Sequence, residues 1–229
     1  MSNNSIKIFI FVFSLILLWS CTDSNGKSIF KPNRIDPPNI QYKEKSLYEE
    51  NVGRHSWQKP ELVIGKLGEV DGKTIADIGA GTGYFAMNLA IRNAKVIAID
   101  IDTAMINFVD YLHELMPSAV QNNITTRLAL PDDPLLKDEE VDMVIIINTI
   151  SYIDNLDAYL KIVQKGIKPN GSIMILDYKN KIIDIDAPPL ADRVSIGMLQ
   201  TYLAAAGYTN IVVDDTSLDY QYIVTAEVE

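Results

Sequence analysis

The chain has 229 residues, of which 48% are hydrophobic and 22% are charged, and these values predict one main globular domain with a substantial core. The formal net charge of -10 argues against nonspecific binding to nucleic acid, because no overall positive field would attract phosphates. Because Cys21 is the only cysteine, the sequence excludes an intramolecular disulfide framework and a cysteine-based metal cluster. Since His55 and His113 are the only histidines, we expect no metal site built from several histidines.

The first 20 residues are expected to form a signal peptide. One cation, Lys7, precedes an apolar run of roughly twelve residues that ends at Trp19, which is short for a bilayer span. The sequence Leu-Trp-Ser-Cys that ends at Cys21 resembles the lipobox of bacterial lipoproteins. The resemblance implies removal of residues 1–20, lipidation of Cys21, and a location in the cell envelope that faces the periplasm or the exterior. The alternative is an uncleaved membrane anchor, which would also tether the chain to a membrane.

Residues 21–45 are expected to form a polar tether. The segment has little hydrophobic periodicity and is interrupted by Pro32, Pro37 and Pro38. Apolar residues return after it, so the folded domain is expected to cover residues 46–229. A short helix is predicted to begin at Pro60.

Beyond Gly72, short apolar runs alternate with amphipathic stretches. The predicted strands cover residues 74–78, 95–100, 124–130, 141–148, 171–178, 208–215 and 220–228, and the predicted helices cover 85–93, 104–116, 155–167 and 195–206. Nearly continuous apolar strands separated by helices predict a parallel sheet that is covered on both faces. We therefore expect a doubly wound α/β fold with a mostly parallel seven-stranded sheet. The connection between the last two strands is too short for a helix, so these strands are predicted to be antiparallel.

The sequence TIADIGAGTGYF, residues 74–85, predicts a ligand-binding turn between the first strand and the first helix. Three glycines, Gly79, Gly81 and Gly83, would let the backbone adopt positive φ angles and approach a ligand closely. The alternative is a glycine-rich connector without a ligand.

The spacing of the glycines and two acids indicates the kind of ligand. A dinucleotide fingerprint would require glycine where Tyr84 stands, and the absence of lysine from the turn excludes a Walker-type phosphate loop. Asp77 would repel a pyrophosphate and attract a cation, and Asp100, at the end of the next strand, could accept hydrogen bonds from both hydroxyls of a ribose. A ligand with a cationic head and a ribose fits both acids.

These residues resemble the class I S-adenosylmethionine-dependent methyltransferases, and in particular the small-molecule branch that includes ubiquinone and menaquinone methyltransferases. ADIGAGTGYF and VIAID carry the resemblance, with SWQKPELVI and GIKPNGSIMILDY as further similar segments. It implies a Rossmann-like methyltransferase fold, S-adenosylmethionine as cofactor, and a small-molecule or lipid-like methyl acceptor. A membrane-anchored binding protein without turnover is the alternative, and an NAD-dependent oxidoreductase is disfavoured by Tyr84 and Asp77.

The resemblance also implies roles for individual residues. Asp77 would hold the methionine amino group through water, and Asp100 would bind the ribose hydroxyls. The remaining cofactor contacts implied are Gly79, Ala80, Gly81 and Gly83 at the methionine and ribose, Ile101 at the adenine, and Asp132, preferred over Asp133, at the adenine amino group. Asn148 would offer a polar contact on the substrate side or cap the following helix.

No catalytic residue is assigned from the sequence, because an acceptor that is already nucleophilic needs no base. Where a base is required, the candidates are His55, Tyr152 and Asp154. Trp57 and residues 149–154 are expected to shape the acceptor pocket.

Overall fold

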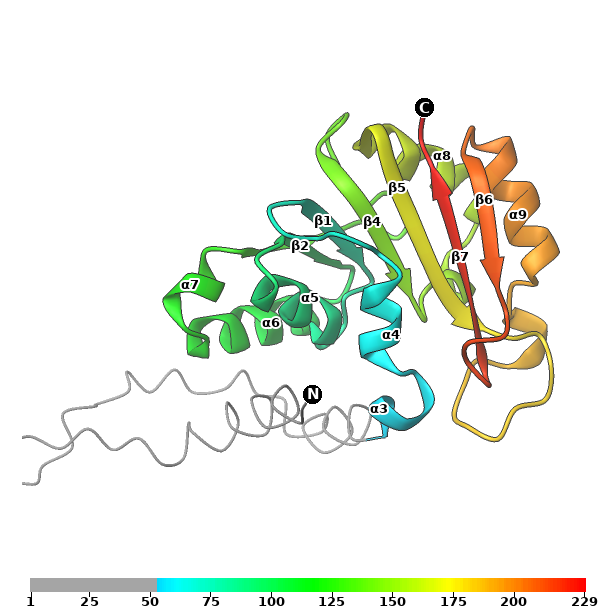
Figure 1. Cartoon of the computed structure of the whole chain (residues 1–229), viewed down its shortest axis with the longest axis horizontal. Coiled ribbons are helices and arrows are strands. Elements are labelled where there is room, and N and C mark those ends of the chain that lie inside the picture. Colours follow the sequence, from blue (N-terminus) through cyan, green and yellow to red (C-terminus); the bar gives the residue numbers. More distant parts are fainter. Residues whose placement is uncertain (1–52) are drawn as a thin grey trace, which may run out of the picture. The chain divides into compact units, whose positions relative to one another are not determined.

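The computed structural model describes residues 53–229, which fold around one seven-stranded sheet (Figure 1). The predicted signal peptide, the tether and Cys21 lie outside the described residues. The strands are β1 (Thr74–Ile78), β2 (Lys95–Asp100), β3 (Ile124–Leu128), β4 (Val141–Ile147), β5 (Ile167–Tyr178), β6 (Thr209–Asp214) and β7 (Gln221–Glu227). Their order in the sheet is β3-β2-β1-β4-β5-β7-β6.

The sheet is parallel from β3 to β5 and antiparallel at its other end. β1 pairs in parallel with both β2 and β4, whereas β7 pairs antiparallel with β5 and β6. The strand order reverses once at β1, because β2 and β3 lie on one side of it and β4 and β5 on the other. The predicted fold class and the antiparallel last strands are therefore confirmed.

Helices cover both faces of the sheet. The described helices are α3 (Arg54–Trp57), α4 (Pro60–Gly65), α5 (Tyr84–Ile91), α6 (Thr103–Leu115), α7 (Ser118–Gln121), α8 (Leu156–Gly166) and α9 (Ile196–Ala205), with 3-10 turns at Ile150–Tyr152 and Leu190–Asp192. Successive side chains of a strand point to opposite faces. Ile75 accordingly packs in the apolar cluster of α4 and α5, while its neighbour Ala76 packs in the cluster of α8 and α9.

Most predicted elements lie within two residues of their predicted bounds, and β5 is the main exception. We expected the helix before it to reach Ile167 and the strand to begin at Gly171, but β5 begins at Ile167, directly after α8. Ile167 is paired with Val141 and is only 2% exposed. Pairing with β4 therefore extends the strand through a polar segment that contains proline and glycine.

The parallel strands end on one edge of the sheet, and this edge carries the loops that are relevant to function. The β1–α5 turn follows Ile78, the β2–α6 connection follows Asp100, and the segment after β4 begins at Asn148. Ligands of open α/β sheets bind outside this edge, near the point where the strand order reverses. Here that point is β1, with β2 and β4 on either side.

Candidate functional site

The glycine turn after β1 adopts the expected backbone conformation. Gly79, Gly81 and Gly83 have φ angles of 74°, 53° and 75°. The backbone N–H groups of Gly79 and Ala80 both donate to the carbonyl of Ile99, at 2.8 and 3.0 Å, which fixes the turn against β2. Gly83 is the N-cap of α5.

The three glycines differ in what surrounds them. A Cβ at Gly79 would lie 2.3 Å from Thr149 Oγ1, and one at Gly83 would lie 3.0 Å from Val109 Cγ2. A Cβ at Gly81 would meet no atom within 4 Å. Gly79 and Gly83 are therefore required by packing, whereas Gly81 leaves open space beside the turn that a ligand could fill.

Asp77 lies at the base of this space and is only 3% exposed. Its Oδ2 atom is buried without a hydrogen-bond partner among the described residues. Burial raises the pKa of Asp77 from 3.8 to about 7, although a hydrogen bond from the Ala86 backbone and the charge of Arg54 oppose the rise. A buried carboxylate that lacks a donor is costly, and a cationic ligand that donates hydrogen bonds would remove that cost.

Asp100 ends β2 and faces the same turn. Its Oδ2 accepts a hydrogen bond of 2.8 Å from the Gly81 backbone, and its Oδ1 accepts one of 2.9 Å from the Asp102 backbone. A carboxylate has about four acceptor positions, so both oxygens can still accept from a ligand. Asp102 instead caps α6 by accepting a 2.8 Å hydrogen bond from the Ala104 backbone.

A cavity of about 100 Å³ brings several of the predicted residues together. It is lined by Arg54, Asp77, Gly79, Ala80, Gly81, Thr82, Tyr84, Phe85, Ile147, Asn148 and Thr149. Ligand pockets usually measure roughly 300 to 1,000 Å³, so this cavity would enclose only one end of a nucleoside-sized ligand. Its lining carries both a carboxylate, Asp77, and a guanidinium, Arg54.

The other predicted contacts lie outside this cavity. Asp100 is next to the cavity, because its side chain accepts a hydrogen bond from the lining residue Gly81. Ile101, the next residue, is 60% exposed. Asp133 is engaged in the turn after β3, where its Oδ1 accepts from the Leu135 backbone, whereas Asp132 is exposed and has no partner among the described residues. Of the two acids, Asp132 is thus the one available to a ligand.

Sequence reasoning missed Arg54, a charged side chain in α3 that is only 6% exposed. It lines the same cavity as Asp77, and its guanidinium carbon lies 5.2 Å from the centre of the Tyr84 ring. No local pattern in the sequence indicates that this arginine is buried, because the helix that carries it is four residues long and packs on distant segments.

Three amide side chains form a second unpredicted feature. Gln58 Nε2 donates to Gln221 Oε1 at 3.0 Å and to Asn148 Oδ1 at 3.3 Å, and Gln221 Nε2 also donates to Asn148 Oδ1. Gln58 and Gln221 are fully buried. Asn148 therefore does not cap the following helix, and its side chain is joined to two segments that are remote in sequence.

The segment after β4 is held by Asp177, near the end of β5. Asp177 Oδ2 accepts from the Ile150 backbone at 3.1 Å, and Oδ1 accepts from Ser151 Oγ at 3.3 Å. Burial raises its pKa to about 6, although these hydrogen bonds favour the ionised form. An acid that follows an apolar strand is the same signal that identified Asp77 and Asp100, so the sequence pattern could have identified Asp177 too.

None of the three candidate bases lines the cavity. His55 Nε2 lies 3.4 Å from the hydroxyl of Tyr84, which is itself a lining residue. Tyr152 is 72% exposed and Asp154 is exposed, both in the segment after β4. Trp57 stacks on Tyr178, with ring centres 6.3 Å apart. The geometry therefore assigns no general base.

The model of the methyltransferase domain family matches residues 69–204, which include the glycine turn, both acids and the amphipathic helices around them. The chain belongs to the methyltransferase domain family. Membership means that the chain carries a methyltransferase domain. The NAD-dependent alternative is thereby set aside.

Individual relatives agree with this family. A ubiquinone biosynthesis O-methyltransferase of Rickettsia bellii is 29% identical over 121 residues, which are 50% of this chain and 46% of the relative. A demethylmenaquinone methyltransferase of Tropheryma whipplei is 26% identical over 114 residues, or 50% of this chain and 45% of the relative. The chain therefore spans less than half the length of these relatives.

A solved structure shows the same methyltransferase fold. The crystal structure of an S-adenosylmethionine-dependent methyltransferase from Aquifex aeolicus matches with a TM-score of 0.69 at 23% sequence identity. The match covers 81% of this chain and 97% of that chain, so the shared fold includes nearly all of the Aquifex protein.

We predict that Asp77→Asn stabilises the methyltransferase domain. Because the pKa of Asp77 is higher in the folded state, its ionisation opposes folding, and this cost grows as pH rises from 3.8 to about 7. Each pKa unit corresponds to about 1.4 kcal/mol, so the cost approaches roughly 4 kcal/mol above pH 7. Since the asparagine amide is also buried, we expect a net gain of about 2 kcal/mol at pH 8 and a smaller gain at pH 5.

Urea denaturation of the full-length protein at both pH values measures this gain. Asp138→Asn is the control, because Asp138 is exposed and its substitution should change the free energy of unfolding little. A loss of stability in Asp77→Asn that is equal at pH 5 and pH 8 would contradict the account of a strained, buried carboxylate.

Proposed function

We propose that this protein transfers the methyl group of S-adenosylmethionine to a small-molecule or lipid-like acceptor at a membrane surface. The observation that carries the proposal is the buried Asp77 carboxylate, whose Oδ2 lacks a hydrogen-bond donor among the described residues and which lines the same cavity as Gly81. When bound, S-adenosylmethionine supplies an electrophilic methyl group on a positively charged sulfur.

The residues of the cavity match the two ends of the cofactor. Asp77 would accept hydrogen bonds from the methionine amino group, and Arg54, the one basic side chain that lines the cavity, would face the methionine carboxylate. Gly81 would admit the ribose, and Asp100 would accept hydrogen bonds from its hydroxyls. Ile101 and Asp132 are exposed on the same edge of the sheet and would contact the adenine.

The acceptor is proposed to be a small molecule with an apolar part. The names of the relatives place quinone precursors among the substrates of similar proteins. The Trp57–Tyr178 stack, the exposed Tyr152 and the buried Gln58 amide, which donates to Asn148, would form the acceptor side of the site. Orienting a nucleophile in line with the sulfonium methyl can supply roughly 7 to 11 kcal/mol without a base.

We further propose that lipidated Cys21 anchors the chain in the envelope and that residues 21–45 are the tether. The support is the lipobox-like sequence at the end of the apolar run. Among residues 53–229, no helix is long and apolar enough to cross a membrane. A lipoprotein faces away from the cytoplasm, where S-adenosylmethionine is made, and this favours the second candidate, a membrane-anchored binding protein without turnover.

A radiolabel experiment distinguishes transfer from binding. Full-length protein with methyl-labelled S-adenosylmethionine should label a fraction of native envelope extract. Asp100→Ala should abolish most labelling and weaken cofactor affinity about tenfold to a hundredfold, because a hydrogen bond to a charged acceptor contributes roughly 1.5 to 3 kcal/mol.

The matched control is Asp102→Ala, which removes the cap of α6 and should cost about 1 kcal/mol of stability with little change in affinity. Cofactor binding without transfer to any lipid, protein or small-molecule fraction would favour the binding protein. Equal loss of affinity in both variants would refute the ribose role of Asp100.

Mass spectrometry of protein extracted from membranes tests the anchor. We expect residues 1–20 to be absent and Cys21 to carry lipid, and we expect Cys21→Ser to release the protein from the membrane fraction. An intact Met1 together with an unmodified Cys21 would contradict the proposal.

A further inference from the structure

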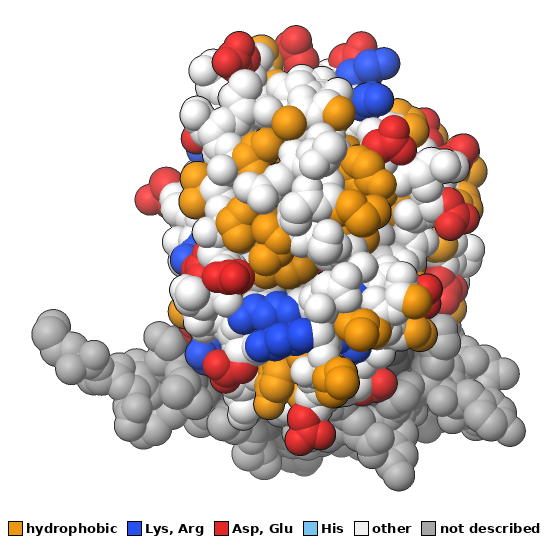
Figure 2. Space-filling model, turned by 90° about the vertical axis from the view of Figure 1, so that its right-hand side faces the viewer, with side chains coloured by type: hydrophobic (Ala, Val, Ile, Leu, Met, Phe, Trp, Pro, Cys, Tyr) orange, Lys and Arg blue, Asp and Glu red, His pale blue; other side chains and the backbone are white. Residues whose placement is uncertain are grey.

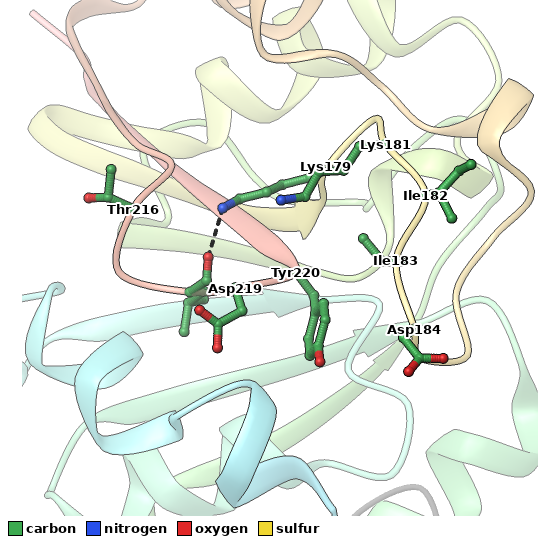
Figure 3. A pocket seen from close by; sticks show the side chains of 9 residues that line it. Lys179, Lys181, Ile182, Ile183, Asp184, Thr216, Asp219 and Tyr220 are labelled. Atoms are coloured by element: carbon green, nitrogen blue, oxygen red, sulfur yellow. Dashed lines mark hydrogen bonds between the residues drawn. The ribbon is translucent and has the colours of Figure 1, made fainter.

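A second and larger cavity lies on the same edge of the sheet as the cofactor site. Its volume is about 470 Å³, within the range of roughly 300 to 1,000 Å³ that is usual for ligand pockets. It lies between the segment after β5 and the β6–β7 loop, and it is lined by Lys179, Lys181, Ile182, Ile183, Asp184, Thr216, Leu218, Asp219 and Tyr220 (Figure 3). On the side of the molecule that carries α9 and β6, apolar side chains lie next to a small group of basic and acidic ones (Figure 2).

Both walls of this cavity are held by hydrogen bonds from half-buried cationic side chains. Lys179 Nζ donates to the backbone carbonyls of Asp215 and Leu218, which ties the β6–β7 loop to the end of β5. Arg193 donates to the carbonyls of Pro188, Lys179 and Lys181, and so holds the segment after β5. The cavity is therefore built by specific contacts, and Lys179 is already engaged in them.

Four other polar groups of the lining have no hydrogen-bond or ion-pair partner among residues 53–229. They are the Lys181 ammonium, the carboxylates of Asp184 and Asp219, and the Tyr220 hydroxyl. Figure 3 shows the Lys181 side chain reaching toward the β6–β7 loop, with Tyr220 on one side of the cavity and Asp184 on the other. Ile182, which is 93% exposed, and Ile183 supply an apolar wall between these charges.

The signs of the charges restrict the class of ligand. A simple anion would meet two carboxylates, and a simple cation would meet Lys181 and Lys179. A neutral apolar molecule would remove charged groups from water without pairing them. A ligand that carries both an ammonium and an anionic group can pair with both signs at once.

We propose that this cavity binds a zwitterionic group, with its anion at Lys181 and its ammonium at Asp184. The group can belong to a free small molecule or to the head of a lipid, since the chemistry that the cavity recognises is the same. The inference goes beyond the methyl transfer proposed above, and it does not require the ligand to be the methyl acceptor.

Calorimetric titration of the full-length protein in a nonionic detergent tests the proposal with defined probes. We expect O-phosphoethanolamine, or mixed micelles that contain phosphatidylethanolamine, to bind at least tenfold more tightly than ethanolamine, inorganic phosphate or phosphatidylglycerol micelles. Binding of the free probe identifies a small-molecule site, and binding of the micelles alone identifies a lipid head-group site. The proposal would be overturned if any probe with charge of only one sign bound as tightly as the zwitterions or more tightly. It would also be overturned if neither zwitterion bound.

Two variants locate the binding in this cavity. Lys181→Met and Asp184→Asn should each weaken zwitterion binding about tenfold, whereas Lys95→Met and Asp138→Asn, which change exposed residues away from the cavity, should leave it unchanged. Unchanged binding in both cavity variants would also overturn the proposal. Titration of S-adenosylmethionine into the same samples keeps the two hypotheses separate, because its failure to bind would contradict only the proposed methyl transfer.

Discussion

A carboxylate with one oxygen that lacks a hydrogen-bond donor among the described residues lies buried at the end of β1, and the functional site is arranged around it. Asp77 is only 3% exposed, and burial raises its pKa to about 7. Folding would be easier with an uncharged residue at this position, since an unpaired buried charge opposes the native state. The sheet can hold Asp77 there because its neighbours in β1, Ile75 and Ala76, are fully buried between two layers of helices.

The rest of the site limits which ligand can satisfy Asp77. The turn after β1 leaves open space only at Gly81, and the backbone of that glycine is held by Asp100. Arg54 adds one positive charge to the cavity, which accommodates a ligand with both an ammonium and a carboxylate. Asn148 lines this cavity and is joined by hydrogen bonds to the amides of Gln58 and Gln221. Gln221 begins β7, and the residue before it, Tyr220, lines the second cavity, so both cavities lie on one edge of the sheet.

Local sequence patterns predicted those parts of the site that depend on a single strand and its turn. Asp77 and Asp100 stand in the last two residues of apolar strands and the glycines follow the first of these strands, so their position at the carboxyl edge could be inferred from the sequence pattern. The positive φ of Gly79 was predicted, but the close packing around it was not, because that depends on Thr149 in the segment after β4. Arg54, Gln58 and Gln221 were missed for the same reason, since each is buried by segments that are distant in sequence. The early start of β5 likewise depends on pairing with β4 and not on the propensity of its own residues.

Proton release on cofactor binding tests the central role of Asp77 most directly. If a cationic ligand pairs with this carboxylate, a group whose pKa is about 7 in the free protein must lose its proton on binding. Titration calorimetry with S-adenosylmethionine at pH 6.5, in buffers of different ionisation enthalpy, should show release of about half a proton or more per molecule bound. Asp77→Asn should show almost none, with weaker binding. Tight binding to the unaltered protein without net proton release would contradict the account.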